Sequence, residues 1–476
     1  MKKYNILFAL LFVFCVTILG GGCGSSHSGN PTAANNSDQF VAAVGDVADD
    51  LQTIANDAFN DRKVVNAIEA IVRQYLITDP NDATIINRAI GKTFSASDIK
   101  VVDLQDNPSF DKIVYVKTWA NRHITAKDGV VADSDFQVGT SDFQLTVISG
   151  DHTTKLTVTP NSTTGYWQAF IASTQLLNKL FDKQLQAFDG ADYNYLVLVY
   201  SYSDATIDVK YDDETLLKGT IKISYPGVTG VTPDTTGAPV YAQTPHTAKF
   251  DLTLYPQASG KDYDVKIELE RNTTSTGTNA ISNVSNLKMY RTTGSNILTM
   301  NAGTDLTATA ASSTPTAASL KALDLNIADK IRLAQSSPLN LVNLMTYYVT
   351  RASSEITAKE VESDAAEINK LLSNAGLAVY LNKSSEKNAD VRATAGEIGG
   401  YNHVRFGLQF VGSDEVELVR DIANPEDVKK IRTLAGSVAP MIQQLADLLT
   451  NNGIITNVTN NKIIKTIFED LFGSSN

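Results

Sequence analysis

A period-two alternation of apolar and polar residues over about Lys100–Met300 constrains the fold of this chain more than any other feature. Phe143, Leu145 and Val147, for example, alternate with polar neighbours. Because successive side chains of a strand point to opposite faces, this pattern is typical of antiparallel strands with one buried face. The pattern recurs, with turn residues in between, at Leu156–Val158, Ile207–Tyr211, Ile221–Tyr225, Phe250–Leu254 and Tyr263–Leu269. We therefore expect an antiparallel β-rich domain, a meander or sandwich-like body, over residues 98–300.

Some segments inside that domain depart from the alternation. Tyr195–Tyr200 (YLVLVY) is apolar throughout, which indicates a central strand buried on both faces. Apolar residues at helical spacing predict a helix over about Ser173–Phe188. Pro226–Thr247 is rich in Pro, Gly and Thr, and we expect a long exposed connection there.

Residues 38–92 are predicted to be helical and to form a hairpin. Apolar residues recur at steps of four and three along the first helix, at Phe40, Val44, Val47, Leu51 and Ile54. That spacing places them on one helical face. A second helix is expected over about Asp61–Ile77, and Asp79-Pro80 ends it. The heptad spacing admits a coiled-coil partner, but the repeat is short, so we favour packing of the hairpin on the chain's own body.

Asn301–Ala318 (NAGTDLTATAASSTPTAA) is a low-complexity Ser, Thr and Ala segment. Since this is the composition of a linker, we expect residues 301–318 to join the β-rich domain to an α+β domain over residues 319–476. In that domain Thr357–Glu360 is a capping box that predicts a helix start, and Gly376 predicts the end of the same helix. Strands are expected at Leu377–Leu381, Val391–Ala395, Val404–Phe410 and Val416–Val419, and other helices at Ser337-Pro338, at Asn424-Pro425 and over about Pro440–Leu449 and Lys462–Phe472. The predicted fold class is therefore α+β: an N-terminal helical hairpin, an antiparallel β body and a C-terminal α+β segment with terminal helices.

Residues 1–22 have the layout of a bacterial lipoprotein signal peptide. Lys2 and Lys3 precede the apolar run Ile6–Leu19, which is too short to span a bilayer comfortably, and small glycines lead to Cys23. In such lipoproteins the cysteine thiol carries a diacylglycerol and its amine a further acyl chain, which together make anchoring stable. Residues 23–37 are polar and rich in Gly, Ser and Asn, so we expect a flexible tether. Cys23 is therefore the predicted lipidation site and the predicted attachment to the membrane.

An ordinary secretion signal is the alternative to a lipid anchor. Bacterial lipoproteins commonly carry Leu three residues before the cysteine, whereas this chain has Gly20 there. Cleavage near the glycines would leave Cys23 as a free thiol. Cys15 lies inside the signal and is removed either way, so the mature chain has one cysteine and forms no intramolecular disulfide. A lone thiol at the N-terminus of an exported protein favours lipidation, and with it a location in the bacterial cell envelope, on the outer membrane.

The net charge of −12 over 476 residues argues against some classes of partner. The phosphates of nucleic acid repel an acidic surface, so we expect no nucleic-acid partner. Peripheral membrane binding through basic patches is disfavoured for the same reason. The hydrophobic fraction of 43% is close to the globular average and supplies a sizeable core.

No motif identifies a catalytic, cofactor-binding or metal site. The five histidines are spread along the chain and form no local metal signature: His27, His123, His152, His246 and His403. Ser-x-x-Lys occurs at Ser97, Ser109 and Ser384, but each lies in a predicted loop or strand start, and the Lys-Thr-Gly companion of penicillin-binding enzymes is missing. Gly91-Lys92-Thr93 lacks the first glycine of a phosphate-binding loop.

Weaker patterns point to ligands. Asp133, Asp135 and Asp142 lie in a Gly/Asp region that would suit calcium, although EF-hand spacing is absent and solvated turn acids are the favoured interpretation. Aromatic residues that would stack on sugars lie in predicted strands, where core positions are more common. These residues are Trp119, Tyr166, Trp167, Tyr193, Tyr200 and Tyr202.

The segment Leu377–Asp421 (LAVYLNKSSEKNADVRATAGE…VRFGLQFVGSDEVELVRD) resembles the C-terminal part of uncharacterised lipoproteins of gut Bacteroidota. Those chains share a tether, helix pairs and β meanders, so the resemblance implies the same layout here and brings no catalytic residues. Acidic residues after the cysteine often mark surface export in that phylum. Gly24, Ser25 and Ser26 stand there instead, which leaves the membrane face open.

These features together predict a lipid-anchored envelope protein that binds a ligand or partner, a glycan or another protein, without catalysis. A glycan hydrolase with a facing pair of carboxylates is one alternative, and residue spacing does not reveal such a pair. An adhesive or structural surface subunit is another. The many predicted helices disfavour it, since fimbrial subunits are mostly β.

Overall fold

The structure is a computed structural model that describes residues 31–58, 63–64, 66–67, 99–103, 111–116, 122–128, 136–138, 141–162, 165–174, 193–224, 246–257, 260–277, 280–308, 315–345, 357–398, 401–418, 422–424, 426–427 and 430. Cys23 and the signal lie outside these residues. So do nearly all of the predicted helix over 173–188, nearly all of the 226–247 connection and the predicted helices over 440–449 and 462–472.

The described residues divide into two compact units. Unit 1 contains those up to Asn56 and those from Lys266 onward, and unit 2 contains those from Asp57 to Val265. This division differs from the predicted domains, because it cuts residues 98–300 at position 265 and places the rest of them with the α+β segment.

α2 (Pro31–Ala58) begins inside the segment that the sequence predicts as a tether. Ala33 and Ser37 are buried, and their spacing continues through Phe40 on the same helical face. Proline is well tolerated in the first turn of a helix. The prediction that the tether reaches residue 37 is therefore wrong, because small residues complete the buried face N-terminal to the large ones.

The apolar face of α2 packs on the chain's own body, as its short repeat predicts. Phe40, Val44 and Val47 are almost fully buried in one cluster with the strands of unit 1. Of the second predicted helix, residues 63, 64, 66 and 67 are described, and these are helical.

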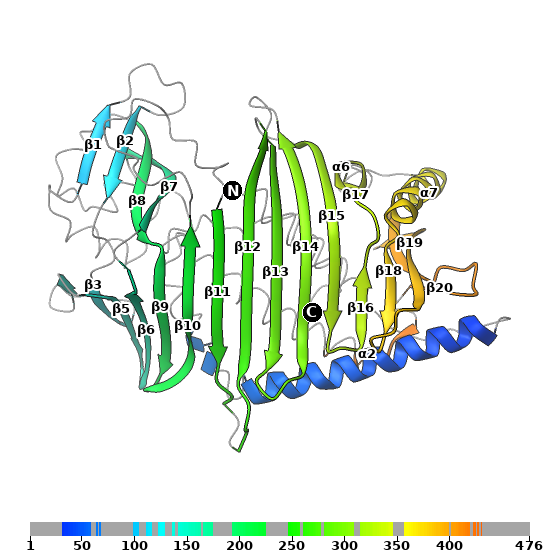
Figure 1. Cartoon of the computed structure of the whole chain (residues 1–476), viewed down its shortest axis with the longest axis horizontal. Helices are drawn as coiled ribbons and strands as arrows, with labels where there is room; N and C mark the ends of the chain where they lie inside the picture. The colour runs from blue at the N-terminus through cyan, green and yellow to red at the C-terminus, as the bar shows by residue number, and fades with distance from the viewer. Residues whose placement is uncertain are drawn as a thin grey trace. The chain divides into compact units, whose positions relative to one another are not determined.

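Unit 1 is built on an antiparallel meander (Figure 1). Its strands are β12 (Val265–Gly277), β13 (Ala280–Arg291), β14 (Asn296–Ala308), β15 (Pro315–Ile327), β16 (Ile331–Ala334), β17 (Leu339–Asn340), β18 (Ala378–Leu381), β19 (Lys387–Ile398) and β20 (Tyr401–Phe410). They lie in the order β20-β19-β18-β16-β15-β14-β13-β12, and β17 pairs with β15. The predicted α+β class is confirmed.

β14 and β15 contain most of the segment that the sequence predicts as a linker. Residues 301–308 and 315–318 form an antiparallel ladder, so the linker prediction for 301–318 is wrong. Ala302 and Ala318 are buried in the core cluster of unit 1. Alanine and threonine carry the alternation here in place of large apolar residues, and the low complexity of the segment hides it.

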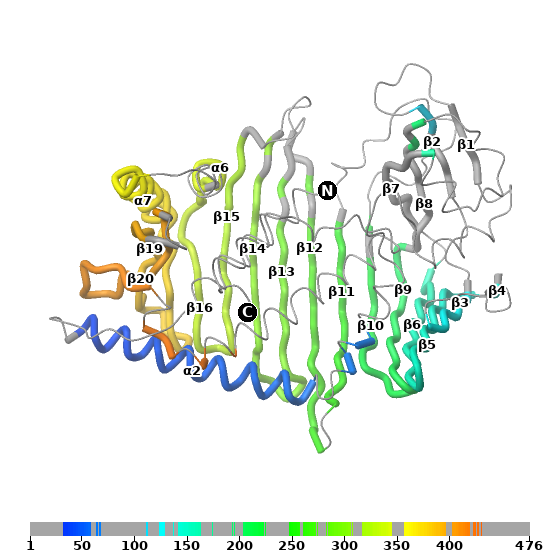
Figure 2. Tube along the Cα trace, turned by 180° about the vertical axis from the view of Figure 1, so that it is seen from behind, coloured from blue at the N-terminus to red at the C-terminus, as the bar shows by residue number. Residues whose placement is uncertain are grey.

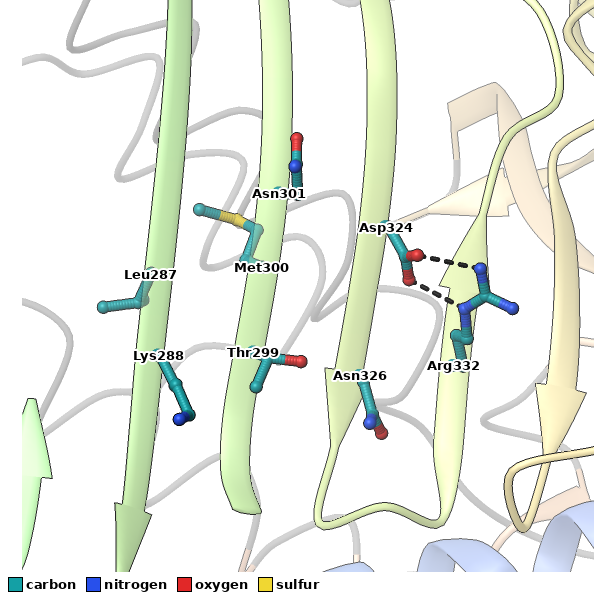
Figure 3. A pocket seen from close by; sticks show the side chains of 8 residues that line it. All are labelled: Leu287, Lys288, Thr299, Met300, Asn301, Asp324, Asn326 and Arg332. Carbon is teal, nitrogen blue, oxygen red and sulfur yellow. Dashed lines mark hydrogen bonds and ion pairs between the residues drawn. The ribbon is translucent and has the colours of Figure 1, made fainter. Parts of the chain in front are cut away.

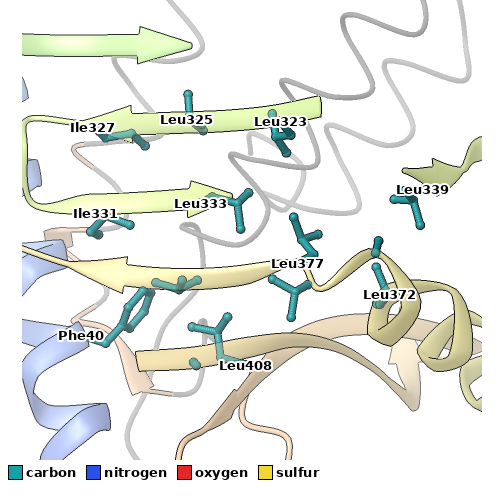
Figure 4. Close-up of a cluster of buried hydrophobic side chains, with 14 of the residues drawn as sticks. Phe40, Leu323, Leu325, Ile327, Ile331, Leu333, Leu339, Leu372, Leu377 and Leu408 are labelled. Atoms are coloured by element: carbon teal, nitrogen blue, oxygen red, sulfur yellow. The ribbon is translucent and has the colours of Figure 1, made fainter. Parts of the chain in front are cut away.

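One face of the unit 1 sheet is apolar and carries the helices. α2 crosses the strands toward one end of the sheet, and α7 (Ala358–Ala375) lies toward the other end of β18–β20 (Figures 1 and 2). Leu325, Leu333 and Leu408 from the strands share one buried cluster with Phe40 of α2 and Leu372 of α7 (Figure 4). The cluster also takes in α6 (Leu341–Met345), which begins shortly after the predicted start at Ser337-Pro338.

The predicted caps of α7 are confirmed. The Thr357 side chain accepts a hydrogen bond from the Glu360 backbone, and the Glu360 side chain accepts one from the Thr357 backbone. This capping box satisfies backbone donors that the first helical turn leaves unpaired. Gly376 ends the helix with φ 58°, a left-handed conformation that glycine adopts without steric cost.

Three of the predicted C-terminal strands are found as β18, β19 and β20, but Val416–Val419 does not form a regular strand within the described residues. Glu417 makes an isolated bridge to Leu408 instead, with both backbone hydrogen bonds at 2.8 Å. Asn424 caps the next helical turn as predicted, because its Oδ1 accepts the Glu426 N–H at 3.0 Å.

Unit 2 contains the predicted hairpins. Its strands are β1 (Ile99–Asp103), β2 (Lys112–Val116), β3 (Arg122–Lys127), β4 (Phe136–Val138), β5 (Phe143–Ser149), β6 (His152–Pro160), β7 (Gly165–Ser173), β8 (Asn194–Tyr202), β9 (Asp204–Tyr211), β10 (Glu214–Ser224) and β11 (His246–Leu254). One set lies in the order β11-β10-β9-β6-β5-β3-β4 and another in the order β1-β2-β8-β7. β8, which contains Tyr195–Tyr200, is an inner strand as predicted. It pairs in parallel with β2, as β3 does with β5, so the body is not purely antiparallel.

Candidate functional site

Register brings polar side chains of unit 1 into rows across four neighbouring strands. Lys288 pairs with Thr299, Thr299 with Asn326, and Asn326 with Arg332. Residues directly opposite each other on neighbouring strands point to the same face, so these side chains share one surface. Together with their neighbours on the same surface, these side chains form the polar face, which consists of Lys288, Thr299, Asn301, Asp324, Asn326, Arg332 and Tyr380.

A second row runs beside the first. Asn301 pairs with Asp324 on the next strand, and Tyr380 of β18 extends the first row because it pairs with Arg332. The neighbours of these residues in sequence, such as Ala302, Leu325 and Leu333, belong to the apolar cluster under the helices. The period-two geometry of the strands therefore separates a polar face from a helix-covered face.

The polar face surrounds a pocket with a volume of about 290 Å³. Figure 3 shows the eight side chains that line it: Leu287, Lys288, Thr299, Met300, Asn301, Asp324, Asn326 and Arg332. Amides, a hydroxyl and both signs of charge are present within this small volume. The remaining two residues, Leu287 and Met300, belong to the apolar cluster of the opposite face or pack against it, so the groups that the polar face offers a ligand are polar.

A bidentate ion pair forms one wall of the pocket. Arg332 donates from Nε to Asp324 Oδ1 and from Nη2 to Asp324 Oδ2, each at 2.8 Å (Figure 3). The Asp324 hydrogen bonds hold the pKa of Arg332 above its usual range. The guanidinium also lies 5.4 Å from the ring centroid of Tyr380, within cation–π distance.

Lys288 lies on the opposite wall. Its Nζ is 4.2 Å from the ring centroid of Tyr290, and the Tyr290 hydroxyl donates to Glu268 Oε1 at 2.7 Å. Lys288 is exposed and has no carboxylate partner among the described residues. The pocket thus has a cation–aromatic pair at each side.

A half-buried carboxylate, Asp329, anchors the turn below the pocket. Asp329 accepts hydrogen bonds from Asn326 at 2.9 Å and Asn296 at 3.1 Å, and Lys383 lies 3.1 Å away. Burial alone would raise the pKa of Asp329, but these three donors outweigh it and lower the pKa below its ordinary value. The Asn326 amide is therefore fixed by the turn, and its position in the polar face is preorganised.

The pocket does not contain the carboxylate pair that a glycosidase requires. Among the described residues that line it, Asp324 alone carries a carboxyl group, and Arg332 occupies both oxygens of that group. A general acid needs a pKa raised toward neutrality. The pKa is instead lowered at Asp142, Asp212 and Asp329.

Each described histidine side chain contacts a different partner. His123 lies 2.7 Å from Asp142, and His152 lies 2.8 Å from Asp212. His403 contacts the Val404 carbonyl through Nδ1 at 2.6 Å. His27 and the side chain of His246 lie outside the described residues. No cluster of potential metal ligands occurs among the residues that the structure describes.

Of the three residues of the candidate calcium site, the structure describes Asp142 alone. Asp133 and Asp135 lie outside the described residues. Asp142 accepts hydrogen bonds from His123 and from Gln144 Nε2, the latter at 3.0 Å. Burial alone would raise its pKa, but these partners lower it. The Asp142 carboxylate is thus occupied by protein donors.

Ser384 is also occupied. Its hydroxyl accepts the Glu386 N–H at 3.0 Å, and the neighbouring Lys387 lies 3.0 Å from Asp390. The lysine therefore pairs with a carboxylate rather than with the serine. Ser97 and Ser109 lie outside the described residues.

The predicted aromatic platform is described in part. The Tyr193 ring lies edge-on to Tyr195 at a centroid distance of 6.1 Å, and the Lys112 ammonium is 4.4 Å from its centroid. Register places Trp167 opposite Tyr200 on β7 and β8. Trp119 lies outside the described residues.

Sequence reasoning missed the polar face. The alternation Lys288-Met289-Tyr290 and Asp324-Leu325-Asn326 is visible in the sequence and would have separated the two faces. It does not say which strands pair, and the pocket depends on that pairing.

No family model matches the chain, and neither a curated protein nor a solved structure matches it.

Proposed function

We propose that this chain is a lipid-anchored protein of the bacterial cell envelope that binds a ligand or partner on the polar face of unit 1, without catalysis. The anchor is Cys23, at the end of the signal sequence. The observation that carries the binding role is the pocket of about 290 Å³, with its preorganised amide, its ion pair and its exposed lysine.

The start of α2 bears on how such a protein sits on a membrane. Gly24–Asn30 is the sequence between Cys23 and the first helical residue, Pro31. If these residues form the tether that their composition predicts, they reach on the order of 15 Å, from about 5–6 Å times the square root of the residue number. A lipid on Cys23 would therefore hold unit 1 close to the lipid surface. Among the described residues, none of the helices qualifies as a membrane span.

The anchor is tested by metabolic labelling with an alkyne analogue of palmitate. The wild-type chain and a Cys15→Ala variant should both carry the label, since Cys15 is removed with the signal. A Cys23→Ala variant should carry none and should leave the membrane fraction or accumulate as precursor. An unlabelled wild-type chain, or equal labelling of Cys23→Ala, would refute the lipid anchor and favour ordinary secretion.

Protease treatment of intact cells, with lysed cells as control, then places the polar face. Digestion in intact cells means that the polar face meets ligands outside the cell. Survival until lysis directs the search to ligands within the envelope.

A further inference from the structure

The charged residues that line the pocket are mostly cationic, whereas the chain as a whole is acidic. The full chain has a net charge of −12, yet the pocket is lined by Lys288 and Arg332 against the single carboxylate of Asp324. A local excess of cation in an acidic protein attracts a ligand of opposite sign to that place, because nearby charges dominate at short range.

Both cations keep capacity for an anion. Arg332 uses Nε and Nη2 on Asp324, and its remaining guanidinium nitrogen points away from that carboxylate (Figure 3). Lys288 contacts the Tyr290 ring, and no carboxylate pairs with it among the described residues. A ligand carboxylate would therefore meet hydrogen-bond donors without displacing a protein acid.

The spacing of the two cations sets the length of the ligand. Lys288 lies on β13 and Arg332 on β16, with β14 and β15 between them. Three strand spacings of about 4.8 Å give a span of about 14 Å. This span exceeds a single sugar ring and fits a chain of linked rings.

Groups that suit sugars lie along the same span. Thr299 and Asn301 offer a hydroxyl and an exposed amide between the cations. Tyr290 lies beside Lys288, and Tyr380 lies beside Arg332. Aromatic rings next to polar donors provide an apolar surface together with hydrogen bonds, and a sugar ring needs both.

We propose that the polar face binds an acidic oligosaccharide whose sugar carboxylates pair with Lys288 and Arg332 while its hydroxyls bond to Thr299 and Asn301. This inference rests on the proposed function, because it takes the polar face as the binding surface. A polyanion as dense as nucleic acid is disfavoured, since the rest of the chain would repel it.

The test is calorimetric titration of the full lipidated protein in detergent with uronic-acid oligomers: oligogalacturonate, oligomannuronate and a hyaluronan oligomer. Each is compared with the same oligomer after its carboxyl groups have been reduced to alcohols. At least one acidic oligomer should bind, and its reduced form should bind at least about fivefold more weakly, which corresponds to one exposed ion pair.

Matched lysine variants locate the binding. Lys288→Glu should weaken binding of the acidic oligomer more than Lys288→Ala does. Lys359→Glu makes the same charge change at an exposed position of α7 and should have little effect.

Equal affinity for the acidic and reduced oligomers would overturn the inference about charge, and equal losses in Lys288→Glu and Lys359→Glu would overturn the location. Failure of every oligomer to bind would overturn the inference altogether. None of these results touches the labelling of Cys23, so failure of this inference is distinguishable from failure of the lipid anchor. Binding of another ligand that is lost in Lys288→Glu would keep the polar face as the binding surface while overturning the acidic oligosaccharide.

Discussion

Asn388 in β19 donates from its side-chain amide to the backbone carbonyl of Asn36, in the first turns of α2, at 3.1 Å. Asn36 in turn donates to the Val411 carbonyl at 3.0 Å. These bonds fasten the start of the N-terminal helix to the β19–β20 hairpin. They explain why α2 begins closer to Cys23 than the composition of the predicted tether suggests.

Asn388→Ala should therefore destabilise unit 1. Asn388 is buried, with 5% exposure, and alanine would remove the hydrogen bonds of its amide to Asn36 together with its packing. We expect a loss of about 1–2 kcal/mol in the free energy of unfolding and faster hydrogen exchange in residues 31–40 of α2. Asn301→Ala, at an exposed amide on the polar face, is the control and should change stability by less than about 0.5 kcal/mol. Unchanged exchange in α2 would contradict this role of Asn388.

Asp329→Asn should destabilise the protein in a pH-dependent way. The pKa of Asp329 is lowered in the folded state, so its contribution is full above the unfolded pKa of about 3.9 and is lost as pH falls through the folded pKa. We expect a loss of about 1 kcal/mol at pH 7 that shrinks toward zero as the pH falls through the lowered pKa of folded Asp329. Urea unfolding across this pH range measures the effect.

Asp213→Asn is the matched control for Asp329→Asn. Both residues have positive φ in tight turns, 58° at Asp329 and 66° at Asp213, and asparagine tolerates that conformation. Asp213 accepts no hydrogen bond among the described residues, so its replacement should leave stability nearly unchanged at every pH. A pH-independent loss in Asp329→Asn would show that the amide disturbs the turn rather than removing a charge.

Gly376→Ala should lower the free energy of unfolding by more than the strain of its backbone conformation alone. Gly376 has φ 58°, and a Cβ there would lie 2.1 Å from Ser336 Oγ. Gly150→Ala, at a turn glycine with φ 59° and open space around the new methyl, isolates the conformational cost, which is about 1 kcal/mol. We expect Gly376→Ala to lose clearly more stability than Gly150→Ala in urea unfolding followed by circular dichroism. Similar losses would mean that the Ser336 contact relaxes freely.

The sequence predicts well the features that depend on neighbours along the chain. The capping box at Thr357, the end of α7 at Gly376 and the buried face of α2 through Phe40 all follow from local spacing. Large apolar residues at period two also locate the hairpins of unit 2, such as Phe143 and Leu145 in β5.

Predictions fail where small residues carry the pattern. Ala33 and Ser37 extend a helix, and Ala302 and Ala318 extend two strands, yet a composition rich in Ser, Thr and Ala is also that of a linker. Burial of a small side chain depends on close approach of the surrounding elements, and local composition does not report it.

The polar face was beyond prediction for a different reason. Alternation shows that Lys288 and Arg332 oppose apolar neighbours, but the pocket requires β13 to β16 to lie side by side in one register. β16 then pairs with β18 across the intervening α6 and α7, which brings Tyr380 beside Arg332. Such long-range pairing is fixed by the packed sheet and not by spacing along the chain.

The most direct test of the central claim is the reactivity of single cysteines placed at Asn301 and Ala302. The proposed lipid on Cys23 would leave the mature wild-type chain without a reactive thiol, so the wild-type chain is the blank for labelling with a maleimide-linked polymer. Asn301→Cys on the polar face should react quickly in the folded protein, whereas Ala302→Cys, at a position with 4% exposure, should react only after unfolding in urea. Equal or reversed rates would contradict an open polar face, and labelling of the wild-type chain would contradict the lipid anchor.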